Sequence, residues 1–227
     1  MANELQRTDA WYLSRKGKLT ASEIVNIMTK GRGKDEVFGK TAISYMNEKV
    51  AERMMDDDAF IWYMTDIKKS TPAMRWGTEY EDTAREQYEM ATGRKVMDCP
   101  FMEMQGYEGY VGGSPDGRCS TMDRIIEIKS PFNPAIHLEH CQWNTPEDLA
   151  KGNPQYYYQV IHNMIITGTK LCDFISYSPL FRGGLDLHIL EIPLDDEYSK
   201  NLMERIDLAV SYIKEQEALL SSVKTKL

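Results

Sequence analysis

The spacing of apolar residues along the chain predicts six helices. In residues 195–220, Leu202, Ile206, Ala209 and Ile213 recur at steps of three or four residues. This period places them on one face of a helix, where they can be buried together. The predicted helices cover about residues 9–16, 21–29, 40–54, 74–92, 154–167 and 195–220.

Between residues 94 and 130 the pattern changes to short runs rich in β-forming residues, separated by Gly, Pro and Asp. Two more such runs, "LCDFISYS" and "LDLHILEI", follow the helix predicted at 154–167. Helices that precede and interrupt a set of strands are typical of α/β or α+β proteins. We therefore expect a central mixed β-sheet flanked by helices, in a single domain that covers residues 1–227.

The charge of the chain limits how it could bind nucleic acid. Its formal net charge of −8 argues against a broad, nonspecific nucleic-acid surface. Residues 1–34, however, carry seven Lys or Arg and only three Asp or Glu. We expect any anion site to be local and close to the N-terminus.

Composition also indicates where the protein works. No apolar run reaches the roughly 18 residues of a membrane span, and charged residues interrupt the N-terminal stretch where a signal peptide would have its apolar core. The four cysteines form no C-x-x-C pair, which argues against a zinc ribbon or a disulfide framework. We expect a cytoplasmic protein without membrane contact.

An unusual pair of charges lies in the predicted strand 124–130, "RIIEIKS". Glu127 and Lys129 are two residues apart, so they share one face of the strand. If the upstream segment that contains Asp116 pairs with this strand, the two carboxylates and the carbonyl of Ile128 could hold Mg²⁺, which prefers oxygen ligands. Such an ion activates water for phosphodiester hydrolysis, and Lys129 could orient that water or stabilise the transition state. The simpler alternative is an exposed salt bridge beside a hairpin turn.

The segment "LTASE" predicts an anion site. Thr20, followed three residues later by Glu23, has the spacing of a capping box, so a helix should begin at Ala21 with free backbone N–H groups. Ser22 lies in its first turn and Arg15 just upstream. Helix starts of this kind bind phosphate. The alternative is that the box only caps the helix.

These motifs, in this order, resemble a known family. "PD" at 115–116 followed by "EIK" at 127–129 has the form of the PD-(D/E)xK nuclease motif. The wider frame resembles phage recombination exonucleases of the lambda exonuclease and YqaJ type. It runs through "LQRTDAWYLSRKGKLTASE", "WGTEYEDTAREQYEMATG", "GGSPDG", "EIKSPF" and "YYYQVIHNM". The resemblance covers the chain from about Leu5 to the last predicted helix and implies a restriction-endonuclease-like core.

The resemblance also implies a role for individual residues. It makes Lys129 the catalytic lysine and Gln159 a helical glutamine that lines the catalytic site. The carboxylates and one backbone carbonyl would bind metal, whereas four residues would form a pocket for a 5′-phosphate. The implied metal ligands are Glu81, Asp116, Glu127 and the carbonyl of Ile128, and the implied phosphate pocket is Arg15, Thr20, Ser22 and Ser114.

The activity implied by the resemblance is a 5′–3′ exonuclease acting on linear double-stranded DNA. It would release 5′-mononucleotides with two Mg²⁺ ions per site, for which Mn²⁺ could substitute, and leave 3′ single-stranded overhangs for recombination. The resemblance further implies a ring-shaped homotrimer, a single-strand annealing protein as partner and a bacterial cytoplasm as location.

Two other functions fit the same residues. A PD-(D/E)xK endonuclease would also cut circular DNA, which an end-dependent enzyme cannot. A non-catalytic module that binds DNA ends would keep the fold without the chemistry. The segments 56–71 and 178–188 show no convincing match to the lambda pattern, so contacts there are not implied.

Overall fold

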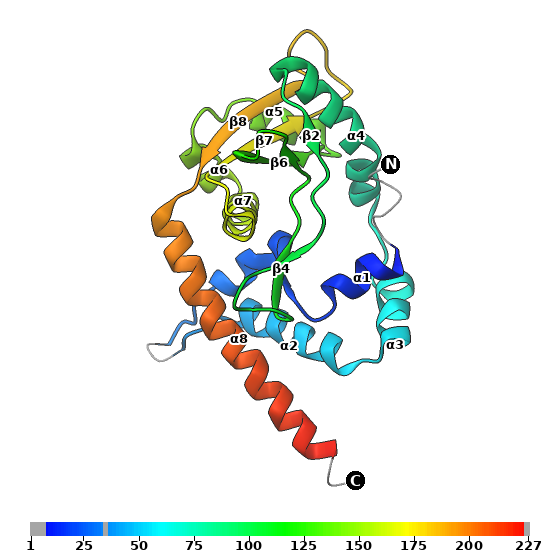
Figure 1. The fold of residues 1–227 in the computed structure, drawn as a ribbon, viewed down its shortest axis with the longest axis vertical. Helices are drawn as coiled ribbons and strands as arrows, with labels where there is room; N and C mark the ends of the chain where they lie inside the picture. Colours follow the sequence, from blue (N-terminus) through cyan, green and yellow to red (C-terminus); the bar gives the residue numbers. More distant parts are fainter. Residues whose placement is uncertain (1–7, 34–35, 225–227) are drawn as a thin grey trace.

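The computed structural model describes residues 8–33 and 36–224. Within these residues, ten helical segments precede, interrupt and follow the strands, and α8 projects beyond the rest of the described molecule (Figure 1). The helical segments are α1 (Asp9–Arg15), η2 (Ala21–Met28), α2 (Lys40–Met54), α3 (Asp57–Trp62), η3 (Tyr63–Ile67), α4 (Pro72–Thr92), α5 (Pro134–His140), α6 (Pro146–Gly152), α7 (Pro154–Thr167) and α8 (Asp196–Lys224).

The described part of the chain forms two mixed sheets. The larger has the strand order β2-β5-β6-β7-β8, in which only β6 and β7 are parallel. The smaller has the order β1-β4-β3, with β1 parallel to β4. The strands are β1 (Leu19–Thr20), β2 (Val96–Met97), β3 (Met102–Glu103), β4 (Val111–Gly113), β5 (Gly117–Cys119), β6 (Arg124–Lys129), β7 (Leu171–Tyr177) and β8 (Leu187–Pro193). The expected α+β fold with a mixed sheet and flanking helices is confirmed.

The alternation of side chains along β6 divides the core in two. Ile125 belongs to the larger apolar cluster, which includes residues of α7 and α8, whereas Ile126 and Ile128 pack with Ala84 and Tyr88 of α4. Successive residues of a strand point to opposite faces. Glu127 and Lys129 therefore share the face of the sheet that α7 covers, and Figure 1 shows α7 lying against β6 and β7.

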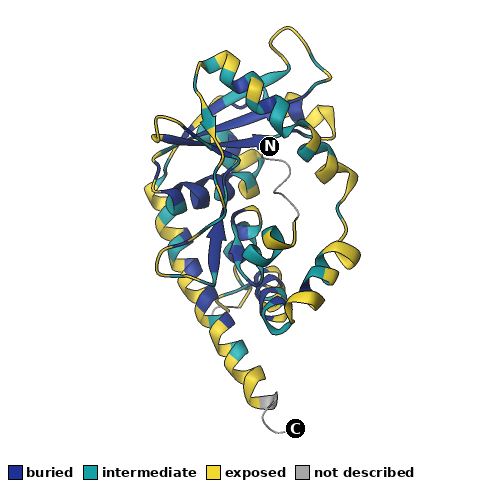
Figure 2. Ribbon diagram, turned by 45° about the vertical axis from the view of Figure 1, so that its right-hand side comes forward, coloured by how far each residue is buried: buried dark blue, intermediate teal, exposed yellow. Residues whose placement is uncertain are grey.

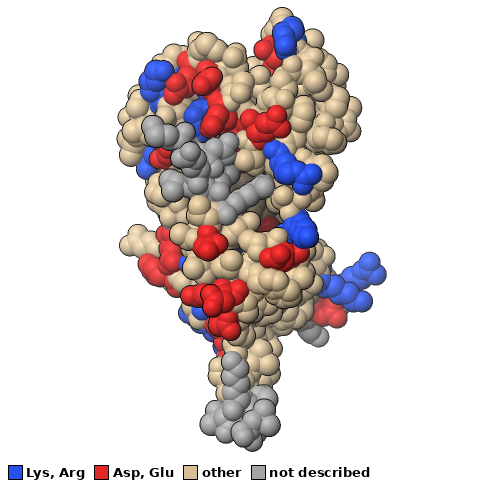
Figure 3. All heavy atoms as spheres, turned by 90° about the vertical axis from the view of Figure 1, so that its right-hand side faces the viewer, with Lys and Arg blue, Asp and Glu red and all other residues tan. Residues whose placement is uncertain are grey.

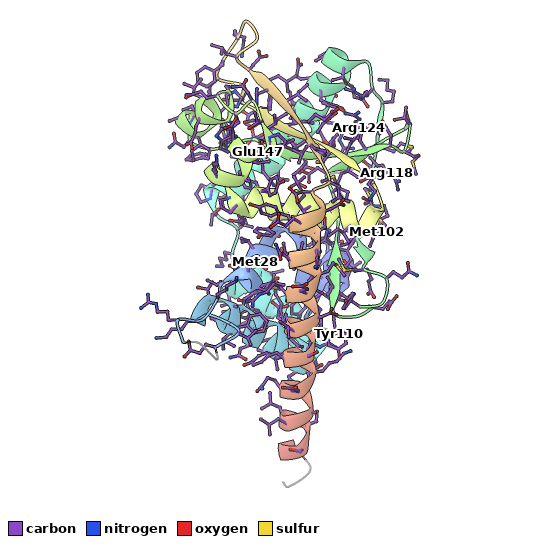
Figure 4. The ribbon with its side chains drawn as sticks, turned by 90° about the vertical axis from the view of Figure 1, so that its left-hand side faces the viewer. Met28, Met102, Tyr110, Arg118, Arg124 and Glu147 are labelled. Atoms are coloured by element: carbon purple, nitrogen blue, oxygen red, sulfur yellow. The ribbon has the colours of Figure 1, made fainter. Side chains whose placement is uncertain are left out.

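The last helix extends the body of the molecule. Its first half contributes buried residues such as Leu202 and Ile206, but its end is exposed, with Leu219 at 59% (Figure 2). Tyr110, labelled in Figure 4, lies beside this helix, and its hydroxyl is 3.0 Å from Oε2 of Glu217. The stripe predicted from Leu202 to Ile213 is buried as expected.

Several elements differ from the sequence-based expectation. The helix expected at 21–29 is a 3₁₀ helix, and α3, η3, α5 and α6 were not predicted. Within the segment 56–71, α3 begins where Asp56 caps the first turn by accepting a hydrogen bond from the N–H of Ala59 at 2.7 Å, and η3 follows it directly. Within the described residues, no helix is long and apolar enough to cross a membrane.

Charge is mixed on the face of the molecule shown in Figure 3. Acidic and basic side chains alternate there, over both halves of the described molecule, without a continuous basic area in that view. This agrees with the expectation drawn from the net charge. On this face, an anion site would have to be built locally, from a few well-placed residues.

Candidate active site

A cleft of about 680 Å³ is lined by the N-terminal helices, by α4 and by the segments 98–101 and 113–116. Seven of the ten predicted site residues line it, although they come from five separate parts of the chain. These seven are Arg15, Thr20, Ser22, Glu81, Ser114, Asp116 and Gln159. The other three, Glu127, Ile128 and Lys129, lie on β6 and contact residues of this set.

Glu127 and Lys129 form the centre of a buried polar cluster. The Nζ atom of Lys129 donates to Oε1 of Glu127 at 2.6 Å and to Oε1 of Gln159 at 3.1 Å. Gln159 in turn donates from Nε2 to Oε1 of Glu127 at 2.5 Å. Glu127 is fully buried, so the alternative of an exposed salt bridge on a strand surface does not describe this pair.

Asp116 lies beside β6 because it immediately precedes β5, which pairs with β6. Its Oδ2 accepts a hydrogen bond from the backbone N–H of Ile128 at 2.6 Å. Its backbone carbonyl accepts one from Nη2 of Arg85 at 2.6 Å, while the Nη1 atom of Arg85 contacts Asp98 at 2.5 Å. Arg85 thus ties α4 to the segment that carries Asp116.

The two carboxylates carry more negative charge than Lys129 balances. Burial raises the pKa of Asp116, and burial together with the charge of Asp116 raises the pKa of Glu127 to about 7. Although burial alone would lower the pKa of Lys129, Glu127 and then Asp116 raise it above its ordinary value. A bound cation would relieve both carboxylates, so this charge distribution fits a metal site.

The donor set suits a hard divalent cation. In residues 8–33 and 36–224, no three side chains of His, Cys, Asp or Glu converge into a ready-made metal site. Mg²⁺ does not require one, because it keeps several waters and is usually held by one or two carboxylates together with phosphate oxygens. Asp116 and Glu127 supply such carboxylates, and Glu81 lines the same cleft from α4.

Arg15 is fixed at the other side of the cleft between two aromatic rings. Its Cζ lies 3.9 Å from the ring centre of Trp11 and 4.6 Å from that of Phe101. Its Nη2 donates to Oγ of Ser114 at 3.3 Å. Burial lowers the pKa of Arg15 to about 10, which still leaves the guanidinium charged at neutral pH. Ser114 is two residues from Asp116, so the anion-binding and carboxylate sides of the cleft adjoin each other.

The expected capping box does not form. Thr20 precedes the helix, but its side chain makes no capping hydrogen bond. Glu23 instead contacts Nζ of Lys49 at 3.5 Å, because the buried lysine on α2 needs carboxylate partners. Thr20 and Ser22 still line the cleft, and Nε2 of Gln155 on α7 holds the carbonyl of Ser22 at 2.9 Å.

A known protein family matches most of this chain. Residues 10–170 match the model of a protein family described as "YqaJ-like viral recombinase domain". The chain belongs to the YqaJ-like viral recombinase family. Comparison with curated proteins gave no match.

Solved structures of exonucleases share the fold of this YqaJ-like chain. An alkaline exonuclease, LHK-Exo from Laribacter hongkongensis, is 27% identical with a TM-score of 0.76, and the match covers 96% of this chain and 99% of that one. LHK-Exo in complex with dAMP matches at 26% identity with the same TM-score and the same coverage of both chains. A phage-related exonuclease from Haemophilus somnus 129PT, at 16% identity and a TM-score of 0.66 over 91% of this chain and 96% of that one, shares the fold. The family and the LHK-Exo structures support a nuclease.

Two residues of the site were missed by the sequence analysis. Arg85 is four residues after Glu81, and Asn163 is four residues after Gln159. Residues at this spacing lie on the same face of a helix. Both could have been identified from sequence as the residues four positions after Glu81 and Gln159, on the same helix faces.

Proposed function

We propose that this protein is a Mg²⁺-dependent 5′–3′ exonuclease that degrades linear double-stranded DNA, releases 5′-mononucleotides and leaves 3′ single-stranded overhangs for recombination. The observation that carries the proposal is one arrangement of charges. Asp116, which lines the cleft, and its neighbours Glu127 and Lys129 on β6 adjoin the guanidinium of Arg15, which could bind an anion. The exonuclease structures to which the chain is similar support the same class of reaction.

The carboxylates of Asp116 and Glu127 would hold the metal, with Glu81 and the carbonyl of Ile128 as further candidate ligands. Bound Mg²⁺, in two ions per site by analogy with the family, or Mn²⁺ in its place, would polarise the phosphoryl oxygen and lower the pKa of the attacking water. The cluster has the oxygen donors and the excess negative charge that such ions need.

Lys129 and Gln159 would act on the attacking water. The ammonium of Lys129 remains protonated at neutral pH, because the two carboxylates raise its pKa. It is suited to hold the water by hydrogen bonding and to stabilise negative charge on the transition state, and less suited to remove a proton. Gln159 contacts both Lys129 and Glu127, so it would fix the ammonium relative to the carboxylate.

The 5′ polarity would come from the pocket around Arg15. Thr20, Ser22 and Ser114 line the cleft beside its guanidinium and offer hydroxyl or backbone groups to a phosphate. A terminal 5′-phosphate held there would present the adjacent phosphodiester to the carboxylates. LHK-Exo forms a complex with dAMP, a mononucleotide of the kind this reaction would release.

Assembly and partners also belong to the proposal. A ring-shaped homotrimer that encloses DNA would need less positive charge than an open surface, in keeping with the mixed charge in Figure 3. The 3′ overhang would pass to a single-strand annealing protein in the cytoplasm of a bacterial host. The trimer could be measured directly by light scattering of the purified protein.

The proposed polarity is tested by digesting linear duplexes with Mg²⁺, carrying either a 5′-phosphate or a 5′-hydroxyl and labelled on each strand end, beside a closed circle. Mononucleotides from 5′-phosphorylated ends, with the circle intact, are expected. Cleavage of the circle would favour a PD-(D/E)xK endonuclease. DNA-end binding without cleavage in any substrate would favour a non-catalytic module.

A further inference from the structure

Helix α7 presents two side-chain amides to the same carboxylate. Gln159 donates to Oε1 of Glu127 at 2.5 Å, and Asn163, one helical turn later, donates from Nδ2 to Oε2 at 3.1 Å. Each carboxylate oxygen is thus held by a different amide. Oε1 also accepts a hydrogen bond from Lys129, and Oε2 accepts the hydrogen bond from Asn163.

The orientation of the Asn163 amide is set by this contact. The side chain is fully buried, and its Oδ1 has no hydrogen-bond partner among the described residues. The opposite orientation would place Oδ1 against the carboxylate of Glu127, which is repulsive. Of the two amide orientations, only the one observed satisfies Glu127.

Close packing holds Asn163 in this place. A Cβ added to Gly113 on β4 would lie 2.6 Å from Oδ1 of Asn163. The neighbouring His162 places Nε2 at 3.2 Å from the carbonyl of Gly112. Helix α7 therefore lies directly on the backbone of β4, just before the segment that carries Ser114 and Asp116.

A packing role alone does not account for an asparagine here. An apolar side chain of similar size would fill the space without leaving a buried oxygen unpaired, which is costly. The hydrogen bond from Asn163 to Glu127 offsets the unfavourable burial of the unpaired Oδ1. In metal sites, groups that hold a ligand in place without touching the metal commonly set affinity in this way.

We propose that Asn163 is a positioning residue for the metal-binding carboxylate: it occupies one lone pair of Glu127 Oε2, so that the carboxylate keeps the orientation in which it can bind a divalent cation. This inference rests on the proposed function, since it assigns to Asn163 the control of the metal affinity of that same site.

The test is calorimetric titration of Mn²⁺ into metal-free protein, without DNA, for the wild type and for Asn163→Leu. Leucine has a similar branched shape but no donor. We expect binding to weaken by about 10- to 100-fold, the range typical for loss of such a supporting hydrogen bond. Thr167→Val is the matched control: Thr167 lies one turn further along α7, is buried, and bonds to Thr169 and to the backbone carbonyls of Asn163 and Met164. This control removes a buried polar contact from the same helix while leaving the side-chain hydrogen bond from Asn163 to Glu127 in place.

Each outcome separates this inference from the proposed function. Mn²⁺ affinity of Asn163→Leu within twofold of the wild type would overturn the role of Asn163 while leaving the metal site intact. If the leucine variant does not fold, judged by circular dichroism, Asn163→Val is titrated and the same criterion applies. A wild-type protein that binds no Mn²⁺ would contradict the proposed metal dependence itself. Equal weakening in Thr167→Val would mean that helix packing, not the hydrogen bond, sets the affinity.

Discussion

Replacing Glu127 by glutamine should change how the stability of the metal-free protein depends on pH. Burial, followed by the charge of Asp116, raises the pKa of Glu127 from 4.5 to about 7. Between these values the folded protein binds a proton that the unfolded chain has released. The contribution of Glu127 to the free energy of unfolding therefore falls as pH rises through this window, and it stays lower above it. Glutamine keeps the shape without ionising.

The size of the effect follows from the two pKa values. A difference of one unit between the folded and the unfolded pKa corresponds to about 1.4 kcal/mol of unfolding free energy. The shift of Glu127 from 4.5 to about 7 should therefore make the protein about 3 kcal/mol less stable above neutral pH than at acid pH. His140 and His162 act in the opposite direction, because burial lowers the pKa of each to about 4. Both proteins contain these histidines, so their contribution cancels in the difference between wild type and Glu127→Gln.

The assay is urea unfolding in the presence of a chelator at pH values from about 4.5 to about 8, followed by tryptophan fluorescence. Stability of Glu127→Gln relative to wild type should rise by about 3 kcal/mol across this range. The ion pair with Lys129 is present only where Glu127 is ionised, so its contribution is already contained in the pKa of about 7. A difference that does not change with pH would refute the reasoning that burial and the charge of Asp116 raise the pKa of Glu127.

Three further substitutions test separate parts of the site. Lys129→Ala should slow cleavage by about 10²- to 10⁴-fold while DNA binding, measured by anisotropy, changes little; retained cleavage would remove Lys129 from the mechanism. Arg15→Ala should abolish the preference for 5′-phosphate over 5′-hydroxyl ends in a competition digest, and an unchanged preference would mean that the pocket does not read the phosphate. Gly113→Ala should lower stability by about 1–3 kcal/mol in thermal melts, because its Cβ would lie 2.6 Å from Oδ1 of Asn163. Gly77→Ala, where a Cβ meets no neighbour, is the control and should not destabilise; similar losses in both variants would argue against the close contact.

The long helices could be predicted from sequence because the period of their apolar residues and the residues at their ends indicate the same bounds. Helices α2 and α7 have the bounds that the pattern indicated, and α7 begins after the capping residue Asn153 and ends at Gly168, which has φ 67°. Helices α5 and α6 were missed, although each starts with a capping residue followed by proline, at Asn133 and Thr145. They are seven residues each, too short for a period to stand out.

The candidate site could be predicted where local geometry decides it. Glu127 and Lys129 had to share a face because a strand has a period of two. The capping box failed for a reason that sequence could not show: Glu23 is drawn to Lys49, a residue of another helix. Contacts between distant segments, such as that of Arg15 with Ser114, depend on the tertiary fold. The resemblance to the exonuclease family, not periodicity, placed those residues together.

The central claim is that the cluster of Asp116, Glu127 and Lys129 is a metal-dependent centre for phosphodiester hydrolysis. The most direct test is release of acid-soluble nucleotides from linear duplex DNA by wild type and Lys129→Ala, each with Mg²⁺ and with a chelator. We predict that the wild type releases nucleotides with Mg²⁺ but not with the chelator. Adding excess Mg²⁺ to the chelated protein should restore release. Release that persists in the chelator, or that Lys129→Ala matches, would contradict the account.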